Sequence, residues 1–549
     1  MEIPQIKIHK IKIKIDLLIL STIILAFVVS TTVTLKNYGL SWDEGLGNLF
    51  FGERYFYYFL NHQEKYVDFK ADLFKETKEF NLFSSPFKNI PYEFPPLADT
   101  ISAGFMYTLS DKLNIMDSID AFHFAKIFLS GIFFIIFYFF IKKELNWQIA
   151  IISTFLLSFY PRYWGDVHFN PKDIPLLIFF SLTIFVYMRW LKKKSWKNAI
   201  LVGLAGGATI AIKANAVFLP FVLIFGLWDI NIKIKPIKEK LLVWGRELMQ
   251  HILMGIVMLI FYIGSWPYLY VHNNPFRGIQ KYFEFIINQG GRRGPMKFQL
   301  APSIQVITSM PEVMAILLLV GIIIAFKFSF KKPNSIYRLL LVWLFFPIFR
   351  ISMPGMVNFD GIRHFLEFLP AACILSGIGL WQIWIWTKKF IPKYSEIIYG
   401  SVCLLLIFNL SYTLISSNPY QYIYYNQFIG GISGAREKFG ENEVTDYWGI
   451  SYRKGIEWLN IHADPNAKVI VPVAGWLVEL SGQIWFRDDI EYLTVDTIDA
   501  LEGLDEPIYL MILYRPGFFD QVAVFALNHY EVVFQENHSN VRLMTIYKK

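Results

Sequence analysis

The feature that most constrains this chain is a series of apolar runs, several of which exceed the roughly 18 residues typical of a membrane span. The first run covers residues 17–35 and follows a lysine-rich start. With 54% hydrophobic residues, the 549-residue chain does not resemble a single soluble domain. The sequence therefore predicts a polytopic α-helical membrane protein. Further spans are expected at 120–141, 147–162, 173–191, 248–271, 311–327, 336–352, 363–387 and 395–415.

One further apolar run, at 198–228, is interrupted at Lys213–Ala214–Asn215. As a single helix it would be about 46 Å long, well beyond the ~30 Å hydrocarbon thickness. Both flanks of the run are strongly basic and should therefore lie on the cytoplasmic side. We expect the run to cross outward and return as two short helices, with Lys213 at the outer turn. This brings the expected number of spans to about eleven.

Loop charges then assign the two sides of the membrane. The first 15 residues contain Lys7, Lys10, Lys12 and Lys14, and the run after them is too long for a typical signal peptide, so we interpret it as a retained anchor with a cytoplasmic N-terminus. Residues 417–549 carry 10 Lys and Arg against 18 Asp and Glu, whereas the whole chain has a net charge of +8. This asymmetry indicates membrane topology and argues against nucleic-acid binding. The expected location is the plasma membrane, with the C-terminal segment extracytoplasmic.

Two parts of the chain are expected outside the lipid. The first external loop, 36–119, contains a weakly apolar stretch at 97–109 that suits an interfacial helix. After residue 446, strand-like pieces at 468–473, 508–514 and 531–534 alternate with helical pieces such as 452–460 and 518–529, which predicts a small α/β domain. We therefore expect a transmembrane catalytic domain at 1–416 and an extracytoplasmic α/β domain at 417–549. The two cysteines, Cys373 and Cys403, lie in apolar runs, so neither a disulfide framework nor a cysteine metal site is expected.

Four groups of polar residues should meet at the outer membrane face. They are Asp43–Glu44, the loop 162–173, Lys213, and the segment 360–364. Charged residues at the edge of a membrane are costly unless they have partners or a function. Transfer of a sugar from a lipid-linked phosphate needs a base for the acceptor hydroxyl and cations for the departing phosphate. These four groups contain residues of both kinds.

Candidate roles follow from side-chain chemistry. The candidate catalytic residues are the carboxylates of Asp43, Glu44 and Asp166, because a carboxylate in a partly desolvated site can act as a base. Arg363 offers a planar fork and Lys213 a point charge for the donor phosphate. A second acid with a histidine could position a divalent cation or the acceptor. The candidate ligands of the phosphate are Lys213, Arg363, Lys172 and His364, and the candidate ligands of a metal are Asp43, Asp166 and His168.

Each candidate has a structural alternative. The pair Asp43–Glu44 could cap the helix that begins near Gly45. Asp166 could belong to a solvated network of loop charges. Lys213 could extend to lipid headgroups, and Arg363 could pair with Asp360 or Glu367. A lone histidine beside one aspartate is also a weak metal-ligand set.

Several of these motifs resemble the GT-C superfamily. They are Asp43–Glu44 in the first external loop, Pro95–Pro96–Leu97 after it, and Arg363–His364 before Leu369–Pro370. The pattern is similar to that of the protein-O-mannosyltransferase and aminoarabinose-transferase type of polyprenyl-phosphate-sugar glycosyltransferases. The resemblance covers about residues 1–430. Further matching segments are Tyr424–Tyr425–Asn426, Gly430–Gly431 and Asp446–Tyr447–Trp448–Gly449.

This resemblance implies a sugar donor on an undecaprenyl- or dolichyl-type phosphate, used at the outer face. By position, Asp43 would be the catalytic or metal-associated acid and Asp166 the second loop acid. Lys213 and Arg363 would be the cations near the donor phosphate. Some relatives bind a divalent metal and others need none, so the resemblance leaves the metal open.

The expected function is membrane-bound glycosyl transfer from a polyprenyl-phosphate sugar to a glycolipid, polysaccharide or protein acceptor. The alternative is a transporter or flippase of lipid-linked sugars, which would bind the same headgroup without chemistry. Transporters often show two similar halves or paired broken helices. This sequence has one broken run, around Lys213, which favours the enzyme. Membrane lipids are the other expected partners.

Overall fold

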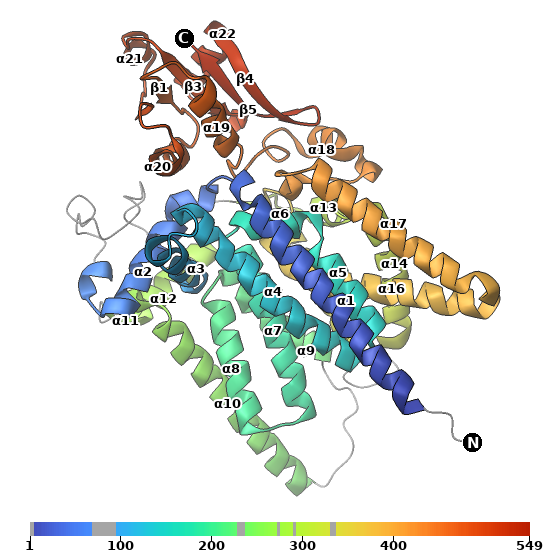
Figure 1. The fold of residues 1–549 in the computed structure, drawn as a ribbon. Coiled ribbons are helices and arrows are strands. Elements are labelled where there is room, and N and C mark those ends of the chain that lie inside the picture. Colours follow the sequence, from blue (N-terminus) through green and yellow to red (C-terminus); the bar gives the residue numbers. More distant parts are fainter. Residues whose placement is uncertain (1–4, 68–94, 228–236, 272–274, 289–292, 330–335) are drawn as a thin grey trace.

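The computed structural model describes residues 5–67, 95–227, 237–271, 275–288, 293–329 and 336–549. It consists of a large helical bundle with a small sheet-containing unit at one end (Figure 1). A helix coincides with each of the eleven expected spans. These helices are α1 (Gln5–Thr34), α4 (Ser118–Glu144), α5 (Trp147–Ser158), α7 (Asp173–Lys192), α8 (Trp196–Ile210), α9 (Leu219–Leu227), α10 (Ile237–Gly264), α14 (Glu312–Ser329), α15 (Ile336–Ser352), α16 (Leu369–Phe390) and α17 (Ser395–Ser416).

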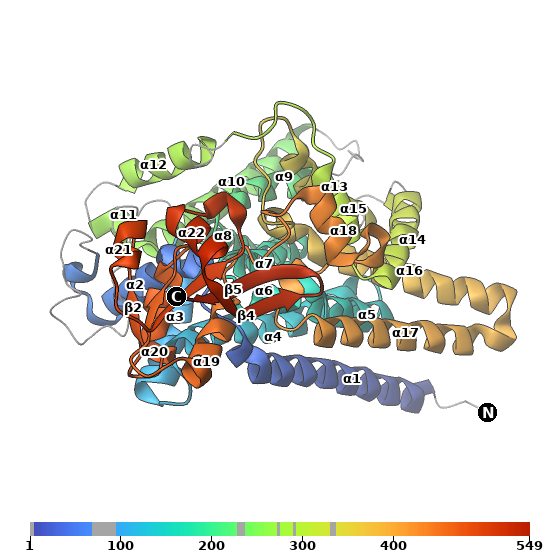
Figure 2. The ribbon, with the colours of Figure 1, turned by 90° about the horizontal axis from the view of Figure 1, so that it is seen from above.

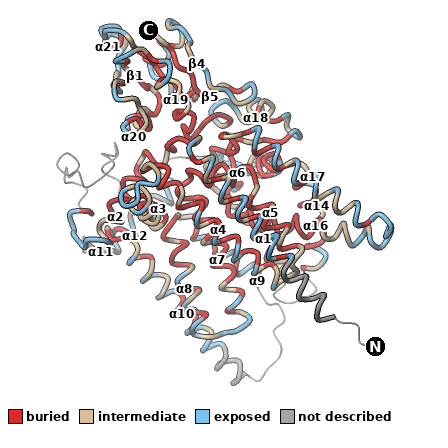
Figure 3. Tube along the Cα trace, in the orientation of Figure 1, coloured by how far each residue is buried: buried red, intermediate tan, exposed pale blue. Residues whose placement is uncertain are grey.

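Seven candidate spans in the described part of the chain are long and apolar enough to cross a membrane. Two shorter apolar helices, Trp147–Ser158 and Ala214–Leu227, accompany them. The multi-pass membrane fold is therefore confirmed, while the number eleven stays a prediction. Figure 3 shows buried residues concentrated in the central helices, whereas α17 and the Trp244–Gly264 part of α10 are largely exposed. Apolar helices with so much exposed surface are suited to contact lipid.

Short helices gather at the end of the bundle that faces the sheet-containing unit (Figure 1). The interfacial helix expected at 97–109 corresponds to α3, and residues 68–94 of the expected 36–119 loop lie outside the described residues. The run at 198–228 breaks as expected: α8 ends at Ile210 and a 3₁₀ turn, Ala214–Phe218, leads into α9. The other short helices are α2 (Leu49–Asn61), α3 (Leu97–Met106), α6 (Pro161–Phe169), α11 (Pro267–Val271), α12 (Pro275–Ile287), α13 (Ala301–Thr308) and α18 (Gly431–Phe439).

Residues 452–548 form a small α/β unit, here called the C-terminal unit. Its five strands have the order β2-β1-β3-β5-β4. β1 pairs in parallel with β2 and β3, and β5 pairs antiparallel with β3 and β4. The expected strands at 468–473, 508–514 and 531–534 correspond to β1, β3 and β4, whereas β2 and β5 were not expected. The elements are α19 (Tyr452–His462), β1 (Lys468–Ile470), α20 (Trp476–Trp485), β2 (Glu491–Leu493), α21 (Ile498–Glu502), β3 (Ile508–Leu513), α22 (Gln521–His529), β4 (Glu531–His538) and β5 (Val541–Lys548).

The C-terminal unit is joined to the bundle by a buried ion pair. Arg453 of α19 donates from Nη1 to Asp120 Oδ1, 2.6 Å away at the start of α4, and to the carbonyl oxygen of Tyr38. Its guanidinium also stacks 4.1 Å from the ring of Trp485. Seen from above, the unit lies over the ends of α3, α4 and α6, with α1 and α17 at the periphery (Figure 2). This contact places the unit over the polar end of the bundle.

Two glycines allow α14 and α16 to cross closely. A β-carbon on Gly321 would lie 1.9 Å from the carbonyl oxygen of Leu375, and one on Gly379 would lie 2.1 Å from that of Leu317. Such small residues let helix backbones approach in a membrane protein. The close α14–α16 contact therefore depends on the absence of a side chain at Gly321 and at Gly379.

We expect Gly321→Ala to lower the free energy of unfolding by about 1–3 kcal/mol, because the added methyl group forces the two backbones apart. Thermal unfolding of the detergent-solubilised protein measures this effect. Gly255→Ala in α10 is the matched control, since a β-carbon there would meet no atom within 4 Å. Equal stability of the two variants would contradict the close-crossing interpretation.

Candidate functional site

Asp43 lies in the chain between α1 and α2, at the bundle end covered by the C-terminal unit. Its side chain is 33% exposed, and its Oδ2 accepts a hydrogen bond of 2.9 Å from Arg363 Nη1. It makes no side-chain cap to the π-helical turn Glu44–Asn48 that follows. Asp43 therefore has an ion-pair partner and a partly exposed carboxylate. Its side chain does not cap the following helical turn, so the capping alternative is not supported.

Glu44 faces the opposite way and is fully buried. Its Oε2 accepts hydrogen bonds from the Ser41 backbone and hydroxyl and lies 2.9 Å from His123 Nε2, while its Oε1 accepts from Lys126 Nζ at 3.1 Å. Burial alone would raise the pKa of Glu44, but His123, Lys126 and the Ser41 amide lower it to about 2. Glu44 is thus charged at neutral pH and enclosed by its partners. This geometry favours a structural role over the expected catalytic one.

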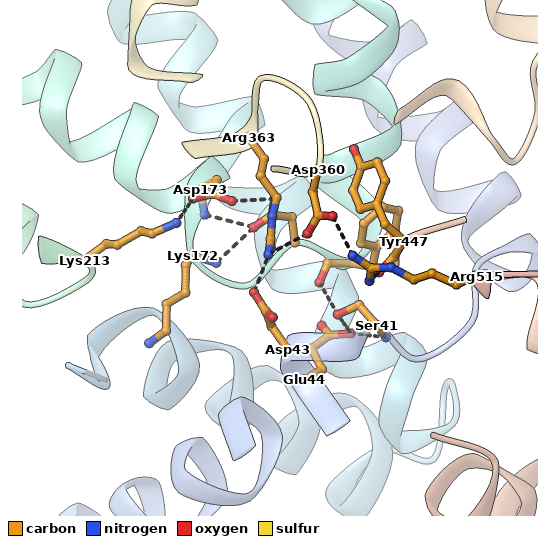
Figure 4. A network of polar contacts seen from close by, with 12 residues as sticks. Ser41, Asp43, Glu44, Lys172, Asp173, Lys213, Asp360, Arg363, Tyr447 and Arg515 are labelled. Atoms are coloured by element: carbon orange, nitrogen blue, oxygen red, sulfur yellow. Dashed lines mark hydrogen bonds and ion pairs between the residues drawn. The ribbon is translucent and has the colours of Figure 1, made fainter. Parts of the chain in front are cut away.

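Arg363 connects Asp43 to a second carboxylate. Its Nη2 lies 3.0 Å from Asp360 Oδ2, and its guanidinium stacks 4.3 Å from the Trp448 ring. Asp360 in turn accepts a hydrogen bond of 3.0 Å from Arg515 Nη2 of the C-terminal unit. Figure 4 shows the side chains of Asp43, Asp360, Arg363 and Arg515 converging, although they come from distant parts of the sequence. The Arg363–Asp360 pairing, the structural alternative to a phosphate-binding role, is present together with the Asp43 contact.

Lys213 pairs with a carboxylate from the neighbouring loop. Its Nζ is 2.5 Å from Asp173 Oδ1, and Asp173 also accepts a hydrogen bond from Asn170 (Figure 4). The Lys213 side chain is 23% exposed, whereas that of Asp173 is buried. An ammonium group at this position can still meet a ligand from the open side.

Asp166 lies on α6 and is almost fully buried. Burial is the main cause that raises its pKa to about 7, assisted by the negative charge of Asp173 and opposed by Arg162 and by an Asn170 hydrogen bond. A carboxyl group with this pKa can exchange a proton near neutral pH. Asp166 therefore remains a candidate second acid, although none of the described contacts joins it to Asp43.

Lys172 is committed to another partner. Its Nζ lies 2.5 Å from Asp99 Oδ2 and donates to the carbonyl oxygen of Pro95 at 2.6 Å. Burial lowers the pKa of Lys172 and raises that of Asp99 to about 6, with the pair's mutual attraction opposing both shifts. The contact ties the Pro95–Pro96 entry of α3 to the 162–173 loop. Its geometry is that of a structural pair, not of a free phosphate ligand.

The two candidate histidines have neighbours other than the acids. His168 Nδ1 lies 2.7 Å from the Trp164 carbonyl oxygen, Nε2 lies 3.0 Å from the Thr34 hydroxyl, and its ring stacks on Tyr38 at 3.8 Å. Burial lowers its pKa to about 3, so the ring is neutral. His364 packs edge-on against Phe359 at 4.4 Å.

These contacts do not fit the expected metal set. Asp43 is paired with Arg363, and both ring nitrogens of His168 already have polar neighbours. Within the described ranges, no three His, Cys, Asp or Glu side chains gather in a group that could hold a metal ion. The residues expected to bind a metal therefore do not form a fitting site.

Sequence reasoning missed several residues of this site. His123 and Lys126 carried a usable signal, because charged residues inside an apolar helix need buried partners. Arg515 carried none, since it is 155 residues away from Asp360 and lies two residues after the buried strand β3. Trp448 belongs to one of the segments that resemble the GT-C superfamily, but its contact with Arg363 is visible only in the folded structure.

This chain is similar in part of its sequence and in its fold to known glycosyltransferases. Residues 95–266 match the family model for dolichyl-phosphate-mannose-protein mannosyltransferase. The fold is similar to the crystal structure of ArnT from Cupriavidus metallidurans bound to undecaprenyl phosphate, with a TM-score of 0.51 and 12% identity over 96% of this chain and 97% of that chain. The apo structure of the same ArnT gives the same values. A comparison with curated protein sequences finds no match. The resemblance to the GT-C superfamily is confirmed, and the transporter alternative is not favoured.

Proposed function

We propose that this chain, a multi-pass membrane protein with the GT-C fold, transfers a sugar from a polyprenyl-phosphate donor to an acceptor hydroxyl. The observation that carries the proposal is the partly exposed Asp43 carboxylate held by Arg363, at the same end of the bundle as Lys213. Support for the donor class comes from the family match to a dolichyl-phosphate-mannose enzyme and from the ArnT structure that holds undecaprenyl phosphate. The acceptor is a glycolipid, a polysaccharide or a protein.

In the proposed reaction Asp43 is the general base. It takes the proton from the acceptor hydroxyl as that oxygen bonds to the anomeric carbon of the sugar. The bond between the anomeric carbon and the phosphate oxygen breaks, and its electron pair stays with the polyprenyl phosphate. The proton then passes from the Asp43 carboxyl group to solvent or to the departing phosphate. The products are the glycosylated acceptor and polyprenyl phosphate.

The cations act on the departing phosphate, whose negative charge grows as the bond breaks. Arg363 offers a rigid fork of donors and Lys213 a mobile ammonium group. Because Lys213 is paired with Asp173, a bound phosphate would share the ammonium with that carboxylate or displace it. Asp166 would serve as the second acid, while Lys172 and His364 would shape the site without holding the phosphate.

The proposed orientation places this site at the outer face of the plasma membrane, with the N-terminus in the cytoplasm. The basic flank of α1 and the acidic residues 417–549 support this orientation through the positive-inside rule. The two-domain division, 1–416 and 417–549, is part of the proposal, and α17 ends at Ser416.

The test is a transfer assay with the purified protein. Labelled polyprenyl-phosphate sugars are incubated in detergent with glycolipid, polysaccharide and peptide acceptors, and the label is followed into product. The same donor is reconstituted in proteoliposomes to measure translocation. Transfer of label supports the proposal, whereas translocation without transfer across these acceptors would favour the transporter.

A further inference from the structure

Arg515 brings the C-terminal unit into direct contact with the site. It follows β3 and is buried, with Nη2 bonded to Asp360 and Nη1 donating to the Tyr447 carbonyl oxygen at 3.2 Å. Its guanidinium also lies over the rings of Trp42, at 5.2 Å, and Phe518, at 4.7 Å. Trp42 is the residue directly before Asp43. Arg515 is therefore fixed from several sides, which suits a group that holds others in place.

The contacts form a line of alternating charges, Arg515–Asp360–Arg363–Asp43, here called the charge chain (Figure 4). Asp360 is bonded to one guanidinium on each side, and Arg363 is bonded to one carboxylate on each side. Each inner group thus divides its attraction between two partners. The strength of the Arg363–Asp43 contact depends on how strongly Asp360 attracts Arg363.

Asp360 itself has little freedom to move. Its backbone lies in the left-handed region, with φ of 56°, and Gly361 follows with φ of 72°. Its amide donates to Glu443 Oε2 at 2.8 Å, which brings another carboxylate close to the Asp360 side chain. The pKa of Glu443 is raised to about 7 by burial and by the nearby Asp360, and Arg515 opposes this rise. Arg515 thus offsets negative charge that would otherwise gather here.

We infer that Arg515 is a positioning residue, which balances Asp360 so that Arg363 can serve Asp43 and the departing phosphate. Without the Arg515 charge, Asp360 attracts Arg363 more strongly, and the fork turns away from Asp43. This inference rests on the proposed function, because it assumes that Asp43 and Arg363 act in the transfer step. It gives the C-terminal unit a part in the reaction through one side chain.

The first variant is Arg515→Gln. We expect kcat for sugar transfer to fall by roughly 10- to 100-fold, the scale of a misplaced catalytic group. The donor KM should stay within about twofold of the native value. The weakened contact, between Arg363 and the departing phosphate, strengthens only as negative charge develops on the phosphate. Arg515→Lys should keep kcat within about threefold of the native value, since one ammonium group can still neutralise Asp360.

The decisive comparison uses Asp360→Asn. Asparagine adopts the left-handed backbone readily, so the turn is preserved. In the Asp360→Asn background the competing charge is gone, and adding Arg515→Gln should change kcat by less than about twofold. Such non-additivity is expected only of residues that act through each other.

Arg487→Gln is the matched control in the same unit. Arg487 also makes several hydrogen bonds, to Asp489 and to the carbonyl oxygens of Asn460, Ala463 and Asp464, but none to the charge chain. We expect its kcat to be unchanged. An equal loss in Arg487→Gln would show that any weakening of the C-terminal unit lowers activity and would overturn the inference.

Two further results would also overturn it: a native kcat in Arg515→Gln, or the same loss in the native and Asp360→Asn backgrounds. If Arg515→Gln does not fold, Arg515→Lys decides, and a tenfold loss of kcat in folded Arg515→Lys contradicts the inference. Full activity of Asp43→Asn would instead refute the proposed base. The two failures are therefore distinguishable.

Discussion

Asp43→Asn is expected to lower kcat for sugar transfer by roughly 10²- to 10⁴-fold, the usual contribution of a general base. The amide oxygen of Asn can still accept the Arg363 hydrogen bond, so the local structure should persist. It cannot accept the acceptor's proton at neutral pH, so the variant removes the base, together with the negative charge that faces Arg363. Initial rates with a labelled polyprenyl-phosphate sugar measure the effect, and thermal unfolding checks that the fold is intact.

Asp488→Asn provides the control for this variant, because Asp488 is an exposed residue of the C-terminal unit away from the charge chain. Its kcat should match that of the native protein. Retention of full activity in Asp43→Asn would remove Asp43 from the mechanism and shift attention to Asp166, whose pKa of about 7 also suits proton exchange.

The largest expected effect on stability is that of Glu44→Gln. The change leaves Lys126 in the protein interior without its carboxylate, and removal of one partner from a buried ion pair costs about 3–5 kcal/mol. His123 also loses its charged neighbour. Thermal unfolding in detergent should therefore show a clearly lower Tm. Glu64→Gln, at an exposed position in the same loop, should leave Tm unchanged.

A companion variant separates charge from packing. In Glu44→Gln with Lys126→Met, no uncompensated charge remains, and part of the lost stability should return.

The pH dependence of stability has a definite sign, because the folded-state pKa of Glu44 lies below its ordinary value. Its contribution is thus fully present above about pH 5 and is lost as the pH falls toward 2. A native Tm for Glu44→Gln would contradict the buried pair.

Much of the membrane fold could be predicted from the sequence, because hydrocarbon imposes a simple rule. A spanning segment must be a long apolar helix that satisfies its own backbone. The break at Lys213 was also predictable, since two basic flanks place both ends of the run on one side of the membrane. Strands β2 and β5 were harder, because short strands in a mixed sheet have weak patterns.

The site could be predicted only in part. Asp43, Lys213 and Arg363 were selected as candidates because each is a charged residue near the end of an apolar run. Of the partners, only Asp360 was considered for Arg363. Lys172 carried the same charge signal but is bonded to Asp99, and Arg515 reaches Asp360 from the segment after β3. Sequence position indicates which charges need a partner, whereas the fold decides which partner each one meets.

The contacts of the C-terminal unit have a consequence for modular exchange between enzymes. Two arginines of this unit, Arg453 and Arg515, each bond to an acid of the membrane part, Asp120 and Asp360. A chimaera that replaces the unit with one from a relative would keep both acids and could lose both arginines. A workable graft must therefore carry its cations to the same two positions, or exchange the acids along with it. Compatibility across this junction is a matter of matched charges rather than of sequence similarity.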